Sequence, residues 1–279
     1  MAKRILVTGS NGYIGSHVVT ALLDRGAQVI AADLAVDHID TRATTVVADI
    51  FTEDTDIMHK LGDPDVCLHM AWKDGFIHNS NAHMECLSAH YTFLDTVMKS
   101  SVKQIAVMGS MHEVGYWEGA INDDTPTNPI NLYGIAKDAL RRALFILQKT
   151  TPVTVQWLRA FYILGDDARN HSIFAKIIEA AKSGQKAFPF NDGSNKYDFI
   201  HVDELAKQIA ASVLQEEVTG IINCCTGQPV SLGEKVESFI KQHGLDLQLQ
   251  YGAFPNRPYD SPALWGDNEK ITKIMKNMR

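Results

Sequence analysis

The chain has little cysteine and no long apolar run. Its 279 residues include only four cysteines, Cys67, Cys86, Cys224 and Cys225, two of which are adjacent. Such sparse usage is not typical of a disulfide framework and predicts a reduced, cytoplasmic protein. Neither a long apolar segment near the N-terminus nor an apolar stretch of about 18 residues occurs, which argues against a secretory signal and a membrane span.

An excess of positive charge is also missing. The chain carries 33 acidic and 26 basic residues and a formal net charge of −7. This balance disfavours a surface for nucleic acid or an anionic membrane but leaves room for a local basic pocket. With 45% apolar residues, a chain of this length can bury a sizeable core in one large domain or two small ones.

Short apolar runs alternate with helical patterns through the first 160 residues. Alternation at this spacing predicts an α/β fold with a Rossmann-like, doubly wound parallel sheet. The expected strands cover residues 4–8, 28–33, 45–49, 65–71, 104–109 and 153–158, and the two long helices cover 79–100 and 131–148. Further on, turn-rich segments separate helical patterns near 172–182, 203–216 and 231–242. We therefore expect a large domain over 1–160 and a smaller, partly interleaved domain over 161–279.

A glycine-rich turn follows the first expected strand and opens a helix. Glycines stand at every third position of Thr8–Gly15. Such a turn lets backbone N–H groups approach a pyrophosphate at a helix N-terminus, so it predicts a dinucleotide site. Asp33 ends the second strand, where a carboxylate can bind the adenosine ribose hydroxyls and repel a 2′-phosphate. Since Ser10 and Asn11 supply no cation, the pattern favours NAD over NADP.

Tyr133 and Lys137 form the only Tyr-x-x-x-Lys pair in the chain. On a helix the two side chains share a face, so the ammonium can lie near the phenol and favour its ionised form. Ser110 lies just past the strand at 104–109. The carboxyl ends of parallel strands face the ligand crevice, where a hydroxyl can bind a substrate oxygen. These three residues are our candidate catalytic group.

These motifs occur in an order that resembles the extended short-chain dehydrogenases/reductases of the NAD-dependent epimerase/dehydratase family. The resemblance covers essentially the whole chain and is strongest in the first half. The matching segments are Thr8–Gly15, Asp33, Asp49-Ile50, His69–Ala71, Ser110, Tyr133 with Lys137, Leu158-Arg159 and Asp198–Asp203.

The resemblance implies a role for each matching residue. Tyr133 would be the general acid/base, Lys137 would bind the nicotinamide ribose and lower the Tyr133 pKa, and Ser110 would orient the substrate. Asp49 and Ile50 would flank the adenine. The implied cofactor contacts are Gly9, Asn11, Gly12, Tyr13, Ile14, Gly15, Asp33, Asp49, Ile50, Met70, Ala71, Tyr133 and Lys137. The expected substrate-binding residues are Ser110, His112, Tyr162, Lys196 and Arg257.

Some positions depart from the family pattern. Cys86 and Tyr162 stand where the family usually has asparagine, and Tyr197, beside Lys196, stands where it often has arginine. Arg257 matches a family arginine that holds a diphosphate. The expected substrate pocket is therefore an altered one.

Dehydratases of the family carry an acidic pair after the hydroxyl residue, because water elimination needs an additional acid and base. Met111 and His112 occupy those positions here. His112 and Glu113 are a weaker alternative source of that chemistry. The sequence therefore favours hydride transfer over dehydration.

Three functions remain open at this point. The leading hypothesis is an NAD-dependent oxidoreductase acting at C4 of a nucleoside-diphosphate sugar, as epimerase or 4-ketoreductase. An alternative is an NAD(P)H-dependent reductase of a small ketone or aldehyde, suggested by Tyr162 and Tyr197. A non-catalytic dinucleotide-sensing regulator is disfavoured because Tyr133 and Lys137 are both present.

Metal binding and oligomeric state can also be predicted. His78, His83 and His90 are spaced five and seven apart, and no Cys-x-x-Cys occurs, so we expect no metal. Family members commonly pair two long helices into a four-helix bundle, and we expect a homodimer of this kind. Its expected outer stripe includes Leu87, Leu94, Leu140, Leu144 and Leu147.

Overall fold

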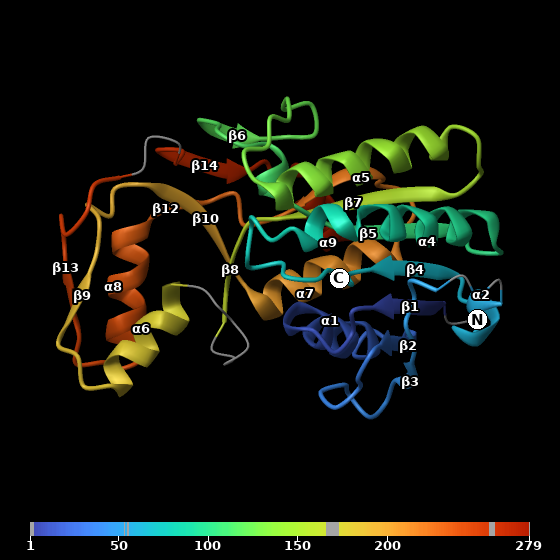
Figure 1. The fold of residues 1–279 in the computed structure, drawn as a ribbon, viewed down its shortest axis with the longest axis horizontal. Helices are drawn as coiled ribbons and strands as arrows, with labels where there is room; N and C mark the ends of the chain where they lie inside the picture. The colour runs from blue at the N-terminus through green and yellow to red at the C-terminus, as the bar shows by residue number, and fades with distance from the viewer. Residues whose placement is uncertain (1–2, 53, 55, 166–172, 257–259, 279) are drawn as a thin grey trace.

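The computed structural model describes residues 3–52, 54, 56–165, 173–256 and 260–278. Its largest element is a seven-stranded sheet in which every neighbouring pair is parallel. In spatial order the strands are β3 (Thr44–Val47), β2 (Gln28–Asp33), β1 (Arg4–Thr8), β4 (Val66–His69), β5 (Gln104–Ser110), β7 (Thr154–Ala160) and β11 (Gly220–Cys224). Figure 1 shows this sheet with helices on both sides. The predicted doubly wound α/β fold is confirmed.

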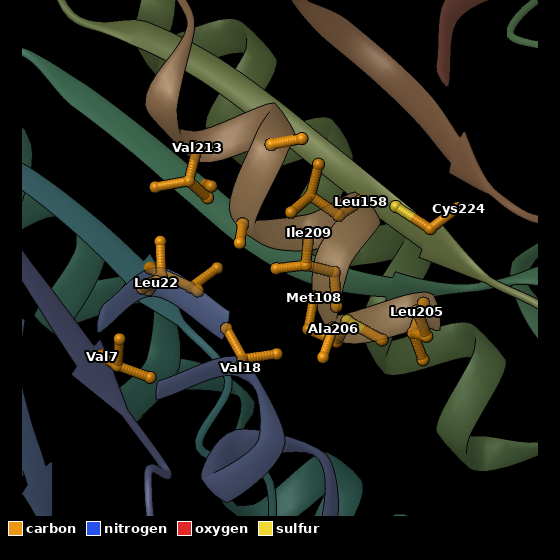
Figure 2. Close-up of a cluster of buried hydrophobic side chains, with 14 of the residues drawn as sticks. Val7, Val18, Leu22, Met108, Leu158, Leu205, Ala206, Ile209, Val213 and Cys224 are labelled. Carbon is orange, nitrogen blue, oxygen red and sulfur yellow. The ribbon is translucent and has the colours of Figure 1, made fainter. Parts of the chain in front are cut away.

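Helices cover both faces of the large sheet. One face packs against α1 (Tyr13–Leu23), α7 (Val202–Leu214) and α9 (Glu269–Asn277), and the other against α2 (Ile57–Lys60), α4 (Leu87–Lys99) and α5 (Leu132–Gln148). Figure 2 shows the first of these cores, where side chains of α1 and α7 meet the sheet. Ile5 and Val7 point into that core while Leu6 points into the other, which explains why the strand reads as a continuous apolar run.

The rest of the chain forms a smaller part with its own core, at the left of Figure 1. Its strands are β6 (Gly119–Ile121), β8 (Tyr162–Leu164), β9 (Ala187–Pro189), β10 (Lys196–His201), β12 (Pro229–Ser231), β13 (Gln248–Gln250) and β14 (Ala263–Gly266). Its helices are α6 (Ile173–Lys182) and α8 (Leu232–Gln242). Strand β10 is central, since it pairs with β8, β12 and β14.

The two parts exchange chain segments. Strand β6, from the first half, pairs with β14, whereas α7, β11 and α9, from the second half, pack on the large sheet. The domain boundary that we predict between residues 160 and 161 therefore divides the chain in sequence but does not separate the two parts in space. It remains a proposal.

The expected helix over 79–100 is two helices. Cys86 separates the four-residue helix α3 (Ala82–Glu85) from α4, which begins at the next residue. The expected leucine stripe also differs, because Leu94, Leu140 and Leu144 are fully buried between the helices and the sheet. They belong to the core of this chain and do not form an outer surface.

All four cysteines are free, and Cys67, Cys224 and Cys225 are buried. Burial raises the pKa of Cys67 and of Cys224 to about 12, so both thiols stay protonated and behave as small apolar side chains. Among the described residues, no helix combines the length and the apolar character needed to span a membrane.

Candidate active site

The glycine-rich turn lies at the carboxyl end of β1, where the strand order of the sheet reverses. Gly9 has a φ of +69°, and a Cβ there would lie 2.5 Å from the Ala71 nitrogen. A Cβ on Gly15 would collide with the carbonyl oxygen of Gly9. Gly12 caps α1 without any side-chain hydrogen bond to the helix N-terminus. The turn thus fits a pyrophosphate, because the N-terminus of α1 directs backbone N–H groups and the positive end of the helix dipole toward it.

Asp33 ends β2 beside this turn. Its carboxylate accepts hydrogen bonds from the backbone nitrogens of Asn11 (2.9 Å) and Leu34 (2.7 Å). The Asn11 side-chain oxygen in turn accepts from the backbone nitrogen of His38 at 2.8 Å. Backbone amides rather than a cation hold Asp33 in this arrangement. Its negative charge is therefore available to attract ribose hydroxyls and to repel a 2′-phosphate.

The charge of Asp33 leads to a prediction about nucleotide preference. Wild-type protein should bind NADH at least about tenfold more tightly than NADPH, because a carboxylate beside a phosphate costs several kcal/mol. The Asp33→Ala variant should bring the two affinities closer together, because it weakens NADH binding and removes the repulsion of NADPH. Calorimetric titration with both nucleotides measures the ratio. Asp24→Ala, which changes an exposed carboxylate at the far end of α1, is the control; equal affinities in wild type would overturn the prediction.

The other predicted cofactor residues also lie near strand ends at this edge of the sheet. Met70 and Ala71 follow β4 directly, and the Met70 nitrogen donates to the Thr8 carbonyl at 3.1 Å. Asp49 is exposed just beyond β3, and its carboxylate accepts from the Phe51 nitrogen at 2.9 Å. Ile50 beside it is buried. One edge of the sheet thus gathers the predicted contacts from β1, β2, β3 and β4.

The structure also brings Ser110, Tyr133 and Lys137 together. Ser110 is the last residue of β5, one residue beyond the predicted end of that strand. Helix α5 begins just before Tyr133 because the Asn131 side chain caps it by accepting from the Gly134 nitrogen at 2.8 Å. The Ser110 side chain lies close enough to the Tyr133 phenol to influence its pKa, and the Lys137 Nζ lies 5.8 Å from the centre of the Tyr133 ring.

Burial governs the protonation of this group. It raises the pKa of Tyr133 above its ordinary value, with the nearby Glu113 charge acting in the same direction and the neighbouring Ser110 side chain opposing it. Burial also lowers the pKa of Lys137 to about 7. Lys137 is expected to lower the Tyr133 pKa, but in this structure the pKa is raised and desolvation of the phenol is the largest influence on it.

Imidazole and indole rings surround Tyr133, which the sequence did not reveal. His78 stacks on its ring with centroids 5.7 Å apart, and the rings of His83 and His112 lie 5.3 and 6.0 Å away. Trp72 meets it edge-on at 6.0 Å. The sequence spacing of His78 and His83 bears on metal binding but does not place their rings beside Tyr133. Within the described residues, no group of three or more His, Cys, Asp or Glu side chains is arranged to hold a metal ion.

His112 lies next to Ser110, as its predicted substrate role requires. Its backbone nitrogen donates to the Ser110 Oγ at 3.3 Å, and its ring lies 4.1 Å from that of His78. Burial and the neighbouring His78 lower the pKa of His112 to about 3. The ring is thus neutral near pH 7 and can exchange hydrogen bonds with a ligand without carrying charge.

Glu113 is fully buried next to Ser110. Its carboxylate accepts from the Ser110 nitrogen at 2.6 Å and from the Trp157 Nε1 at 2.8 Å. The guanidinium groups of Arg159 and Arg141 approach it at 3.5 and 3.6 Å. With these partners Glu113 fixes the turn that presents Ser110. It is poorly placed to act as the additional acid or base of a dehydratase.

The structure brings together only some of the predicted substrate-binding residues. Tyr162 of β8 packs against Tyr197 of β10 with ring centroids 4.3 Å apart, and burial raises the pKa of the Tyr162 phenol. Lys196 is exposed, and successive strand residues point to opposite faces, so it points away from the face of Tyr197. Arg257 lies outside the described residues. The substrate roles of all three remain predictions.

Comparison with known proteins agrees with this architecture. A family model described as "NAD dependent epimerase/dehydratase family" matches residues 5–225. The chain is 42% identical over 269 residues to a dTDP-6-deoxy-L-talose 4-dehydrogenase (NAD(+)) of Aggregatibacter actinomycetemcomitans, covering 94% of this chain and 98% of that protein. It is 27% identical over 303 residues to a UDP-glucose 4-epimerase of Lactobacillus helveticus, covering 98% of this chain and 91% of that protein.

Solved structures show the same fold. A UDP-N-acetylglucosamine 4-epimerase from Methanobrevibacter ruminantium M1 aligns with a TM-score of 0.84 at 21% identity, over 98% of this chain and 92% of that one. A UDP-glucose 4-epimerase from Thermotoga maritima aligns with a TM-score of 0.82 at 22% identity, over 97% and 91% of the two chains.

The family match extends over most of the chain, and the 42% identical relative is matched almost end to end. Both agree with the glycine turn, Asp33 and the strand order found above. The predictions of an enzyme and of NAD as its cofactor are thereby confirmed. The chain belongs to the NAD-dependent epimerase/dehydratase family.

Proposed function

We propose that this protein is an NAD-dependent 4-dehydrogenase, or in reverse a 4-ketoreductase, of a nucleoside-diphosphate 6-deoxyhexose. The placement of Ser110 against Tyr133 beside the dinucleotide turn supports the chemistry, because it offers a hydroxyl pair to one sugar oxygen. Similarity to the dTDP-6-deoxy-L-talose 4-dehydrogenase along nearly its whole length supports the substrate class. Two 4-epimerase relatives are less similar, each at 27% identity.

In this mechanism Tyr133 moves the proton and Ser110 positions the sugar oxygen. Bound NAD would accept or deliver the hydride. The raised pKa of Tyr133 keeps its phenol protonated near neutral pH, so it can donate a proton to a C4 carbonyl oxygen during reduction. In the opposite direction the phenolate form of Tyr133 takes the proton of the C4 hydroxyl as the hydride leaves C4. Neutral His112 would hydrogen-bond a neighbouring sugar hydroxyl.

An epimerase would use the same residues but would leave no net change in NAD. The discriminating experiment supplies dTDP-6-deoxy-L-talose with NAD+ and, separately, UDP-glucose with catalytic NAD+. We expect NADH to accumulate in proportion to oxidised dTDP sugar and no galactose epimer to form from UDP-glucose. Epimer formation without net NADH would refute the proposal and make the protein a 4-epimerase.

Reduction of a small neutral ketone or aldehyde is the second candidate. The contact between Tyr162 and Tyr197 favours it, because two phenol rings occupy positions where the family often uses polar contacts to a sugar nucleotide. In the nucleotide-sugar reaction that we propose first, by contrast, Arg257 binds the diphosphate of the substrate. Activity on simple ketones, with none on any nucleotide sugar, would establish the second candidate instead.

We also propose that the protein is a homodimer and predict that α4 and α5 form the interface. The outer face of these helices and of α3 exposes Met84 (43%), Tyr91 (38%), Ile135 (39%) and Ile146 (65%). Ile135 and Ile146 are three helical turns apart and therefore share one side of α5. Light scattering should give twice the mass of one chain, and Ile135→Asp together with Ile146→Asp should give a monomer. A monomeric wild-type protein at micromolar concentration would contradict this proposal.

A cytoplasmic location is a further part of the proposal. The four free cysteines are compatible with a reducing compartment, and three of them are buried as thiols. Fractionation of the source cells with an antibody to the protein would test the location.

A further inference from the structure

Trp72 contacts both ionisable members of the candidate catalytic group. It follows β4 by three residues, at the point where the strand order of the sheet reverses. The Lys137 Nζ lies 3.7 Å from the centre of the indole, and the Tyr133 ring meets the indole edge-on at 6.0 Å. No motif in the sequence marked this tryptophan as part of the site.

Neighbouring histidines hold the indole in place. The Trp72 Nε1 donates to His83 Nδ1 at 3.1 Å, and the other ring nitrogen of His83 lies 2.9 Å from the Ile77 carbonyl oxygen. His83 must therefore carry its proton on Nε2. The indole also stacks on His90, with centroids 4.3 Å apart and an interplanar angle of 16°.

The stack continues into the large sheet. His90 Nδ1 and His69 Nε2 are 2.9 Å apart, and His69 Nδ1 lies 2.8 Å from the Thr8 Oγ1. Thr8 immediately precedes the glycine turn. The indole is thus connected through side chains to the strand that presents the dinucleotide site, and its orientation is fixed on two sides.

Lys137 needs such support because it is buried. Its ammonium donates to the Met108 carbonyl at 2.6 Å, and burial lowers its pKa to about 7. An aromatic face attracts a cation most strongly where water is excluded. An ammonium has three N–H donors, so one bond to Met108 and contact with the indole still leave a donor for a ligand.

We propose that Trp72 is a positioning residue for Lys137, its indole face holding the ammonium charged and directed toward the ribose of the bound nucleotide. This inference rests on the role given to Lys137 under the proposed function. Trp72 acts through Lys137 and is itself neither acid nor base.

Two substitutions at Trp72 separate this role from simple space filling. Trp72→Leu removes the aromatic face, and Trp72→Phe keeps a ring while losing the hydrogen bond to His83. We expect the leucine variant to bind NADH about ten- to thirtyfold more weakly and to turn over more slowly by a similar factor. The phenylalanine variant should stay within about threefold of wild type. Calorimetric NADH titration, activity and thermal unfolding are measured on each folded protein.

A double-variant comparison tests whether the effect passes through Lys137. In a Lys137→Ala background, adding Trp72→Leu should weaken NADH binding by less than about twofold, since the cation is already gone. Equal losses in the leucine and phenylalanine variants, an unchanged leucine variant, or a full additional loss in the double variant would each overturn the inference. If Lys137→Ala alone leaves NADH affinity and turnover unchanged, the proposed role of Lys137 fails instead.

Discussion

Replacement of Tyr133 by phenylalanine should lower kcat by about 10²–10⁴-fold, the usual contribution of a positioned general acid or base. The phenol lies beside the Ser110 side chain, and burial keeps it protonated by raising its pKa. Phenylalanine keeps the ring that packs against His78 and Trp72, so the fold and the nucleotide site should persist. NADH affinity should therefore stay within about twofold of wild type.

Tyr251→Phe is the matched control for this experiment. Tyr251 lies in the smaller part of the molecule and hydrogen-bonds Glu237 at 2.7 Å, so its loss should leave kcat unchanged. Steady-state rates of both variants, with NADH titrations on the same preparations, give the comparison. Full activity in Tyr133→Phe would move the acid to another residue, with His112 the next candidate because it adjoins Ser110.

Loss of the Glu113 carboxylate should have the largest effect on stability. Glu113→Ala would leave the fully buried Arg159 without its carboxylate partner and remove the acceptor of the Trp157 N–H group. Breaking a buried ion pair from one side costs about 3–5 kcal/mol, because the remaining charge stays away from water. We expect the free energy of unfolding to fall by that amount in urea titrations.

Glu113→Ala should also lower kcat, since the same carboxylate accepts the backbone N–H of Ser110. Glu118→Ala is the control: Glu118 hydrogen-bonds the exposed Tyr116, and its removal should change stability by no more than about 0.5 kcal/mol. A Glu113 variant as stable as this control would show that the buried guanidinium groups do not depend on the carboxylate.

Local sequence patterns were sufficient to predict which residues gather at the candidate nucleotide site. The glycine spacing, the apolar run before it and Asp33 at the end of the next strand are features of one βαβ unit. Neighbouring parallel strands then bring them together without further information. Tyr133 and Lys137 could also be paired from the sequence, because residues four positions apart on one helix share a face.

Contacts between distant segments could not be predicted in this way. Trp72, His78 and His83 reach Tyr133 only because the segment after β4 packs on the start of α5, where the Tyr133 nitrogen donates to the His78 carbonyl at 2.9 Å. The sequence suggests Glu113 as a candidate acid, but its partners Trp157 and Arg159 lie in β7, which is distant in the sequence. No periodicity in the sequence records such pairings.

Helical patterns also leave open which apolar stripe faces inward. Leu94, Leu140 and Leu144 were assigned to an outer stripe, but they face their own sheet. The apolar residues that do face outward on α4 and α5 include Tyr91 and Ile135. An amphipathic helix shows that one face is buried without showing whether its own sheet or a second subunit buries it.

Transfer of deuterium tests the proposed reaction most directly. The enzyme is incubated with a 4-keto 6-deoxyhexose linked to dTDP and with NADH carrying deuterium at both positions of the reactive ring carbon. We expect one deuterium at sugar C4 and one NAD+ formed for each sugar reduced, with incorporation by Tyr133→Phe slowed by about 10²–10⁴-fold. Product without deuterium at C4, or sugar conversion with no net NAD+, would contradict the proposed reaction.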